Sequence, residues 1–143
     1  MAAGGISFED LGIGQSAAAT RTVSEADVIA FAAVSGDANP VHLDADYAAK
    51  TPFKQRIAHG MLTASFISAL IAGRLPGPGA VYISQSLSFR RPVLFGAEVT
   101  TTVTVTALDP AKARATLACQ CSVDGKAVLE GEAVVMVPRR APA

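Results

Sequence analysis

The residues with the clearest potential for chemistry are Asp37 and His42, which lie five positions apart around Pro40. A carboxylate and an imidazole that bind the same water can act as a general acid and base, because one takes a proton while the other gives one. The spacing alone is a weak signal. A simpler interpretation is that Asp37 caps a local turn, since Asx turns are common, while His42 packs against the next helix.

A second chemical element is the tripeptide His59-Gly60-Met61. A glycine at a helix N-terminus exposes its backbone N–H with no side chain in the way, at the positive end of the helix dipole. A thioester carbonyl placed there would be stabilised as negative charge develops on its oxygen. The alternative is that Gly60 only begins the helix and that His59 makes a structural hydrogen bond near the cap.

The segment before Asp37 is predicted to be a helix from about Ser24 to Ser35. Ser24 is a suitable N-cap, and Asp27 stands in the position of a capping box. Gly36 follows the helix as the left-handed residue that commonly ends one. The first helix should therefore deliver the chain directly to Asp37.

The stretch from Asp37 to His42 is expected to be a loop, because Pro40 favours an extended conformation for Asn39. A short helical turn over Ala45 to Lys50, capped by Asp44, is expected to follow it. The loop would then hold both members of the candidate pair between two helical segments.

The helix that begins at His59-Gly60 should run to about Gly73. Its residues are apolar on nearly every face, and a helix without a polar face is a buried one. The proline- and glycine-rich stretch from Leu75 to Gly79 ends it. A buried helix of this kind needs a sheet or other helices to cover it.

After residue 80 the hydrophobic pattern changes from a helical period to the alternation of strands. Five strands are expected, at about residues 16–23, 80–92, 99–106, 115–123 and 127–137, the last two joined by an Asp124-Gly125 hairpin turn. The pattern predicts an α+β architecture, in which a meander of consecutive antiparallel strands curls around the apolar helix. A sheet edge would be left open for pairing with a second copy.

Composition narrows the class of protein. The 143 residues suit one domain, 1–143, and the 12 basic residues balance the 12 acidic ones without any block of like charge. Neither nucleic-acid binding nor attachment to a membrane is therefore expected. The mean hydropathy of +0.37 is high for a chain without a membrane span, which favours an oligomer that buries apolar surface between subunits.

The two cysteines, Cys119 and Cys121, should lie on one face of a strand as buried free thiols. Near neighbours of this kind seldom form a disulfide, and two ligands make a poor zinc site. The N-terminal residues Met1 to Gly5 lack the charged and apolar regions of a secretory signal. These features together suit a cytoplasmic protein.

Three motifs in this order resemble the MaoC-type (R)-specific enoyl-CoA hydratases: Ser35-Gly36-Asp37-Ala38-Asn39-Pro40-Val41-His42, His59-Gly60-Met61 and Phe89-Arg90-Arg91-Pro92-Val93. The resemblance extends from about Phe8 to Pro138. It implies a hot-dog fold, in which a curved antiparallel sheet wraps around a long central helix. It also implies a homodimer whose two sheets join edge to edge, with active sites near the subunit interface.

The resemblance further implies the reaction, which is the reversible syn addition of water to a trans-2-enoyl-CoA to give the (R)-3-hydroxyacyl-CoA. Asp37 and His42 would activate the water, the Gly60 amide would hold the thioester oxygen, and Asn39 would orient the pair or the water. Which member of the pair is the base stays open, because coupled groups resist single labels. Neither a cofactor nor a metal is expected.

The same resemblance suggests where the acyl chain lies. Gly60, Ala64, Ser68 and Ile71 form one stripe of the central helix, so Ser68 and Ile71 would face the acyl tail if Gly60 faces the thioester. The size of Ile71 favours short or medium chains. Arg90 and Arg91 would meet the CoA phosphates or form a solvated strand end.

The sequence argues against three other classes of protein. A hot-dog thioesterase usually carries a carboxylate on or near its central helix, and none lies between His59 and Gly73. A non-catalytic thioester-binding subunit would be expected to lack one of Asp37 and His42. A metal hydrolase that uses these two residues and His59 lacks a recognisable ligand motif.

Overall fold

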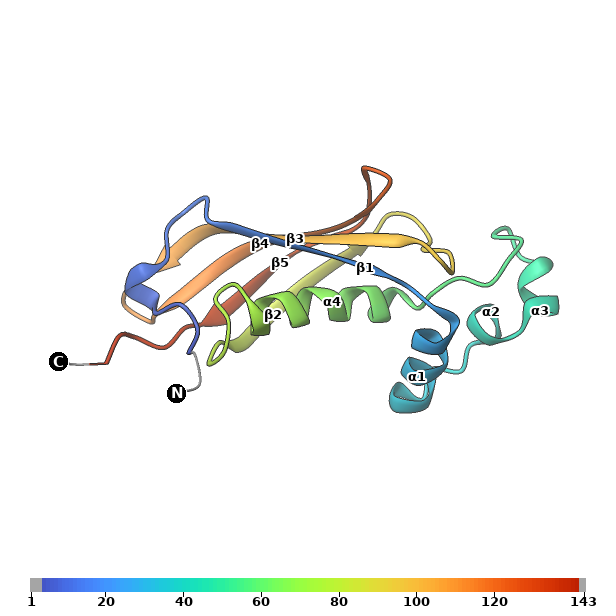
Figure 1. Ribbon diagram of the computed structural model, residues 1–143, viewed down its shortest axis with the longest axis horizontal. Helices are drawn as coiled ribbons and strands as arrows, with labels where there is room; N and C mark the ends of the chain where they lie inside the picture. Colours follow the sequence, from blue (N-terminus) through green and yellow to red (C-terminus); the bar gives the residue numbers. More distant parts are fainter. Residues whose placement is uncertain (1–3, 142–143) are drawn as a thin grey trace.

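The computed structural model describes residues 4–141, which form a five-stranded antiparallel sheet and the helices around it. The elements in chain order are the 3-10 helix η1 (Phe8–Asp10), β1 (Ser16–Thr22), α1 (Glu25–Ser35), α2 (Pro40–Leu43), α3 (Ala45–Ala49), α4 (Gly60–Gly73), β2 (Val81–Phe89), β3 (Glu98–Asp109), β4 (Arg114–Val123) and β5 (Lys126–Met136). Figure 1 shows α4 along one face of the sheet, with α1, α2 and α3 grouped beyond its N-terminus. The α+β architecture expected from the sequence is confirmed.

The order of strands differs from the expected meander. The sheet runs β1-β3-β4-β5-β2, so β2 pairs with β5 at one edge and β1 pairs with β3 at the other. Consecutive pairing holds only for β3, β4 and β5. The link between β2 and β3, residues 90–97, has no hairpin turn to keep its strands adjacent; instead Leu94 bridges to Ile57 and the Val93 carbonyl accepts the Ala58 N–H at 2.8 Å.

The hairpin between β4 and β5 agrees with the sequence. Asp124 and Gly125 both have positive φ, 51° and 76°. Positive φ at both central residues is the geometry of a type I′ turn, whose twist matches that of the strands it joins. The turn therefore fixes the register of the two central strands of the sheet.

The sheet-facing side of α4 forms the centre of the core. Ile67 and Ile71 are at most 2% exposed and belong to one apolar cluster with Val103 of β3 and Leu117 of β4. The expected burial on every side is wrong for the outer face, where Met61 is 54% exposed and small residues predominate. A single sheet covers one face of a helix, so this outer face lies open in the single chain.

The helices before α4 begin and end close to the predicted positions. Ser24 caps α1 in a complete capping box with Asp27, and Gly36 ends it with φ of 80°. The expected loop is confirmed at 37–39 but is wrong for Pro40–Leu43, which forms the single helical turn α2. Proline is favoured at a first helical position, and the Asn39 side chain caps this turn by accepting the Val41 N–H at 3.2 Å.

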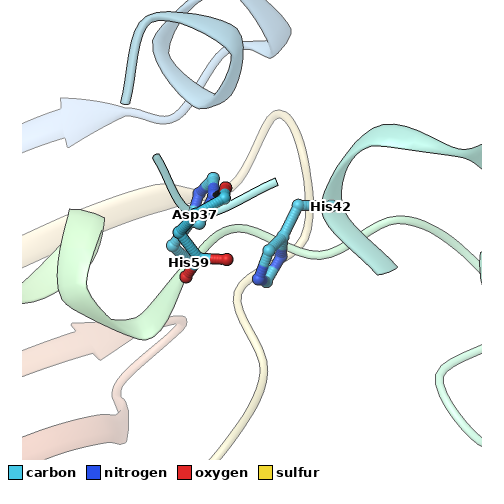
Figure 2. A group of neighbouring side chains, drawn as sticks. All are labelled: Asp37, His42 and His59. Atoms are coloured by element: carbon cyan, nitrogen blue, oxygen red, sulfur yellow. Dashed lines mark hydrogen bonds between the residues drawn. The ribbon is translucent and has the colours of Figure 1, made fainter. Parts of the chain in front are cut away.

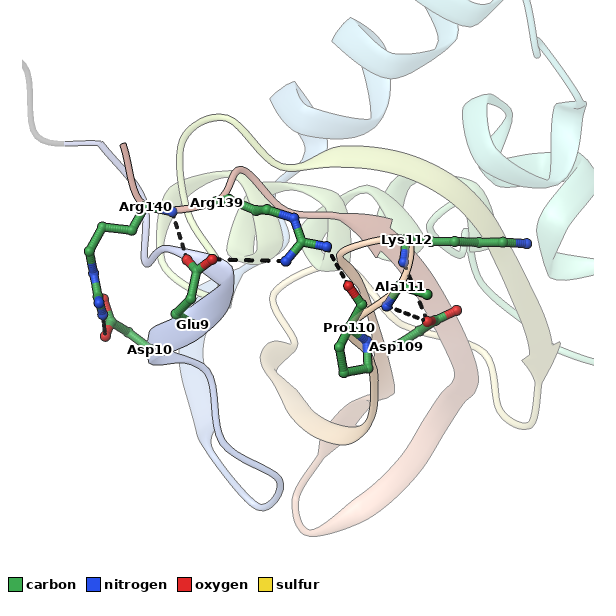
Figure 3. A network of polar contacts seen from close by, with 8 residues as sticks. All are labelled: Glu9, Asp10, Asp109, Pro110, Ala111, Lys112, Arg139 and Arg140. Carbon is green, nitrogen blue, oxygen red and sulfur yellow. Dashed lines mark hydrogen bonds and ion pairs between the residues drawn. The ribbon is translucent and has the colours of Figure 1, made fainter. Parts of the chain in front are cut away.

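The two ends of the described chain meet on the side away from α1 to α3 (Figures 1 and 3). The Arg140 N–H donates to Glu9 at 2.6 Å, and the Arg140 guanidinium pairs with Asp10. Exposed ion pairs add little stability by themselves, so the buried ring of Phe8 contributes more to holding this corner. The chain ends therefore lie on the opposite side of the molecule from α1, α2 and α3.

Two expectations drawn from the sequence concern the N-terminal residues and membrane-spanning helices. Residues 1–3, which are part of the stretch judged to lack a secretory signal, lie outside the described residues. Within 4–141 no helix is both long and apolar enough to span a membrane.

Cys119 and Cys121 are free and buried in β4, as expected. Burial raises the pKa of both thiols, because a thiolate loses its hydration there. We predict that iodoacetamide at mildly alkaline pH modifies the folded protein about 100-fold more slowly than the denatured chain, since only exposed thiolate reacts. Mass spectrometry should count two modified thiols in guanidinium chloride; rapid modification of the native protein would contradict the buried placement.

Candidate active site

Asp37 lies in the loop between α1 and α2, and backbone contacts on both sides fix its conformation. Its N–H donates to Ser35 Oγ at 3.0 Å, and its Oδ1 accepts the Asn39 N–H at 3.2 Å. The carboxylate thus forms the Asx turn that the simpler interpretation of the sequence proposed. The second oxygen, Oδ2, is not used by that turn, and the residue is exposed. The turn therefore occupies one carboxylate oxygen and leaves the other available for a second contact.

His42 projects from α2, is 8% exposed, and has its tautomer set by the backbone. Its Nδ1 lies 2.7 Å from the carbonyl oxygen of Ile57. A carbonyl can only accept, so Nδ1 carries the proton and the neutral ring keeps Nε2 free as an acceptor. A proton acceptor held in one orientation is what a general base requires.

Arg56 holds the backbone of α2 in place. Its Nε–H donates to the His42 carbonyl at 2.9 Å, and its Nη1 pairs with Glu25 of α1 at 2.6 Å. The guanidinium also lies over the ring of Phe95, 4.7 Å from its centroid. Nothing in the local sequence pattern marks Arg56 as a functional residue, because its partners are 14 and 31 residues away.

His59 is 1% exposed and lies between the other two residues and α4 (Figure 2). Its Nε2 donates to the backbone carbonyl of Asp37 at 2.9 Å, and its ring stacks on that of His42 with centroids 4.0 Å apart. Phe31 of α1 covers it at 4.8 Å. Its Nδ1 is buried and has no hydrogen-bond partner among residues 4–141. The expected structural hydrogen bond near the cap is thus present, and its acceptor is Asp37.

Gly60 begins α4, and its N–H and that of Met61 precede the first amide that bonds back to His59, that of Leu62 at 3.1 Å. Amides at this position have no acceptor within the helix and point outward from its N-terminus. A Cβ on Gly60 would lie 2.6 Å from Cε1 of Phe89. A side chain here would therefore have to turn the half-exposed ring of Phe89 aside, which glycine avoids.

A cavity of about 470 Å³ opens beside these groups and is within the range of small-molecule sites. Its wall is mostly apolar and includes Asp37 and the start of α4; the lining residues are Asp37, Phe53, Ile57, Ala58, Gly60, Met61, Thr63, Phe89, Arg90, Arg91, Pro92, Val93, Val128 and Leu129. His42 does not line it directly. The cavity therefore joins a carboxylate, a helix N-terminus and two arginines in one apolar recess.

The separation of Asp37, His42 and His59 suits a bridging water. One nitrogen or carboxylate oxygen of each lies within 4.8 Å of the others, and within the described chain no direct hydrogen bond links the Asp37 and His42 side chains. A water that bonds to two groups at about 2.8 Å spans a gap of about 4.6 Å. Such a water would lie between a carboxylate and the free Nε2 of an imidazole.

The same three residues are the candidate ligands for a metal ion among the described residues. Their geometry fits a metal poorly. The two imidazoles are stacked, with planes 32° apart, so lone pairs that lie in these planes do not converge at a point about 2.1 Å from both nitrogens. The arrangement favours the pair of Asp37 and His42 acting on water.

The remaining predicted residues fall in different places. Asn39 is exposed, and its carboxamide oxygen caps α2, so it supports His42 through the helix that carries it. Among the described residues, neither Ser68 nor Ile71 lines the cavity beside Gly60: Ser68 is exposed on α4, and Ile71 is buried in the core. The expected stripe of α4 therefore has different surroundings along its length: Gly60 lines the cavity, Ser68 is exposed and Ile71 lies in the core.

Thr63 is a further residue that sequence reasoning missed. It lies one turn after Gly60, is 2% exposed and lines the cavity. Its Oγ1 is buried without a hydrogen-bond partner in the described part of the chain. In the sequence, only its polar side chain among the apolar residues of α4 marks Thr63 as a candidate for the site. Ser65 and Ser68 are polar residues of the same helix and do not line the cavity.

Comparison with known proteins agrees with this site. The model of the MaoC-like domain family matches residues 9–125, and the chain belongs to this family. It is 57% identical to an (R)-specific enoyl-CoA hydratase of Rhodospirillum rubrum over 133 residues, which cover 93% of this chain and 92% of that protein. It is 53% identical to a 3-hydroxybutyryl-CoA dehydratase of Methylorubrum extorquens, with coverage of 93% and 85%.

Solved structures give the same fold. The unliganded R-hydratase PhaJ1 of Pseudomonas aeruginosa superposes with a TM-score of 0.90 at 48% identity, covering 95% of this chain and 88% of that one. The (R)-hydratase of A. caviae involved in PHA biosynthesis superposes with a TM-score of 0.88 at 47% identity, covering 91% and 99%. The hot-dog fold implied by the sequence motifs is therefore confirmed.

The contact between Gly60 and Phe89 gives a testable result. Gly60→Ala should lower the free energy of unfolding by about 0.5–1.5 kcal/mol, because the new methyl group turns the half-exposed ring of Phe89 away from its preferred rotamer. In a Phe89→Ala background the same change should be neutral within about 0.5 kcal/mol. Denaturant unfolding of the four proteins in this double-mutant cycle measures the coupling.

The matched control is Gly73→Ala at the other end of α4. There a Cβ would meet no atom of the described residues within 4 Å, so stability should not fall. A cycle without coupling between positions 60 and 89 would show that the ring does not rest on Gly60 in solution.

Proposed function

We propose that this chain is an (R)-specific enoyl-CoA hydratase that adds water reversibly to a trans-2-enoyl-CoA and forms the (R)-3-hydroxyacyl-CoA. One observation carries the proposal: Asp37 and the free N-terminal amide of Gly60 line one cavity, and His42 lies within water-bridging reach of Asp37. The hydratase and dehydratase activities of relatives that are 57% and 53% identical over nearly the whole chain support the same activity here.

The proposed mechanism uses one water. Asp37 and Nε2 of His42 bind it, and as its oxygen forms a bond to C3 of the substrate, one O–H bond breaks towards the pair. The pair then supplies a proton to C2 on the same face, which gives syn addition. The thioester oxygen becomes enolate-like between these events and is held by the Gly60 N–H at the positive end of α4.

The acyl tail and the CoA phosphates of the substrate would contact residues outside the water-activating pair. Contact with Ser68 and Ile71, and a preference for short or medium chains, stay predictions, because these residues lie outside the cavity described above. Arg90 and Arg91 line the cavity; Arg90 lies 3.7 Å from Glu130, and Arg91 donates to the Ala127 carbonyl. Both arginines are exposed, so the two interpretations of them, phosphate contact and solvated strand end, stay open.

Loss of either member of the pair should abolish most turnover. Asp37→Asn and His42→Ala should each lower kcat with crotonyl-CoA by about 100- to 10,000-fold, the contribution expected of general acid–base groups. The assay follows loss of the conjugated enoyl thioester by its absorbance. Asp46→Asn, which removes an exposed carboxylate of α3, is the matched control and should leave kcat unchanged.

A parallel assay for free thiol separates this proposal from a thioesterase. Release of thiol without hydration would overturn the hydratase proposal, and so would near-normal turnover by Asp37→Asn or His42→Ala. Inactivity towards enoyl-CoA of every chain length, with no thiol release, would indicate a binding subunit.

The assembly proposed for the enzyme is a homodimer joined along β2. This strand lies at the sheet edge, carries no charged residue over its nine positions, and exposes Val81, Tyr82 and Ile83. Edge strands of monomeric proteins are usually protected by charge, and the opposite edge strand, β1, carries Arg21. An unprotected apolar edge favours pairing with a second copy. The free thiols of β4 further suit a reducing compartment such as the cytoplasm.

Ile83→Glu should convert the dimer to monomers. Ile83 is 42% exposed and lies at the register shift of β2, so a carboxylate there should spare the pairing with β5. Ile13→Glu, at a position 71% exposed before β1, is the control and should stay dimeric. Analytical ultracentrifugation measures both; a monomeric wild type or a dimeric Ile83→Glu would contradict the proposed interface.

A further inference from the structure

His59 connects Asp37, His42 and Gly60, the three residues of the proposed site. Its Nε2–H bonds to the Asp37 carbonyl at 2.9 Å, its ring stacks on His42 at 4.0 Å, and its backbone is the N-cap of the helix that begins with Gly60. Since it is 1% exposed, it cannot reach a substrate without rearrangement. Its contacts are with the groups proposed to act, and not with the reacting atoms.

We infer that His59 is the positioning residue that sets the distance between the water-activating pair and the Gly60 amide. Asp37 and His42 lie on a short loop and a single helical turn, which are flexible elements by themselves. Gly60 belongs to α4, which the core holds rigidly through residues such as Ile67. His59 connects the two parts, because its main chain continues into α4 while its side chain fixes the loop.

The environment of the ring shows that orientation matters. The Asp37 carbonyl accepts a hydrogen bond from Nε2–H, so the neutral ring has an unprotonated Nδ1, and that atom is buried with no partner among residues 4–141. Burying a polar atom without a hydrogen bond is unfavourable. The neighbouring rings of Phe31 and His42 hold the imidazole in this orientation even so. A residue needed only to fill space would be satisfied by an apolar side chain here.

The inference rests on the proposed hydratase function, and two substitutions separate the two contacts. His59→Gln keeps an N–H donor for the Asp37 carbonyl but removes the ring beneath His42. His59→Phe keeps a ring and removes the donor. Each should lower kcat for crotonyl-CoA hydration by about 10- to 100-fold with KM within about threefold, because misplacement of the reacting groups by about 1 Å has effects of this size.

The control for loss of stability is Val103→Ala, at a fully buried site in β3 that does not line the cavity. This variant should unfold at a lower temperature than the wild type and keep its kcat. Normal kcat in both His59 variants, a rise in KM alone, or an equal fall of kcat in Val103→Ala would each overturn the positioning role.

A second measurement does not depend on activity. The chain has two histidines, so imidazole nitrogen NMR spectra of the untagged protein contain two sets of signals, and each His59 variant leaves only that of His42. The wild type should show His59 protonated on Nε2 and His42 on Nδ1. Protonation of His59 on Nδ1 would overturn the inference. An inactive wild type with these tautomers would instead overturn the proposed function and leave the contacts of His59 established.

Discussion

The site depends on two hydrogen bonds from imidazoles to backbone carbonyls. His42 donates to Ile57 and His59 donates to Asp37, each from one ring nitrogen. Each bond connects segments that are distant in sequence, and the stacking of the two rings joins the bonds into one unit. They add to the contacts that Arg56 and the Ile57 N–H make with α2, and the bond from His59 ties the loop at residue 37 directly to the start of α4.

The rest of the fold supplies the rigid end of this unit. The inward face of α4 packs into the apolar cluster beneath β3 and β4, with Ile67 at its centre. Because a helix packed in this way cannot shift without opening the core, its N-terminal amides keep their direction. The fixed dipole and the fixed N–H are what a developing enolate needs, since they require no reorganisation as the charge appears.

Local sequence predicted the elements whose signals are local. The capping box at Ser24 and Asp27, the apolar helix after Gly60 and the Asp124-Gly125 turn are all found at their expected positions. Each depends on residues within a few positions of one another, so a single sequence carries the whole signal. The candidate residues Asp37, His42 and Gly60 were identified in the same way, with the order and spacing of the motifs as the added information.

The missed turn α2 had local signals, in Pro40 and its Asn39 cap, but the other missed features depend on partners that local patterns do not specify. β2 lies beside β5, and the link over residues 90–97 bridges to Ile57 before α4, and no turn signal indicates either contact. The acceptors of the two histidines are backbone carbonyls, and every residue has one. Arg56 and Phe89 likewise act through contacts to residues 14 to 31 positions away.

β2 links the chemistry to the proposed assembly. Phe89 at its C-terminal end lies on Gly60 and lines the cavity, while Ile83 near its N-terminal end lies on the open edge of the sheet. Pairing of two such edges would restrict the motion of the whole strand, including the 54% exposed ring of Phe89. The ring that lies against Gly60 is therefore carried by the element that a second copy would order, and the site is expected to be most rigid in the dimer.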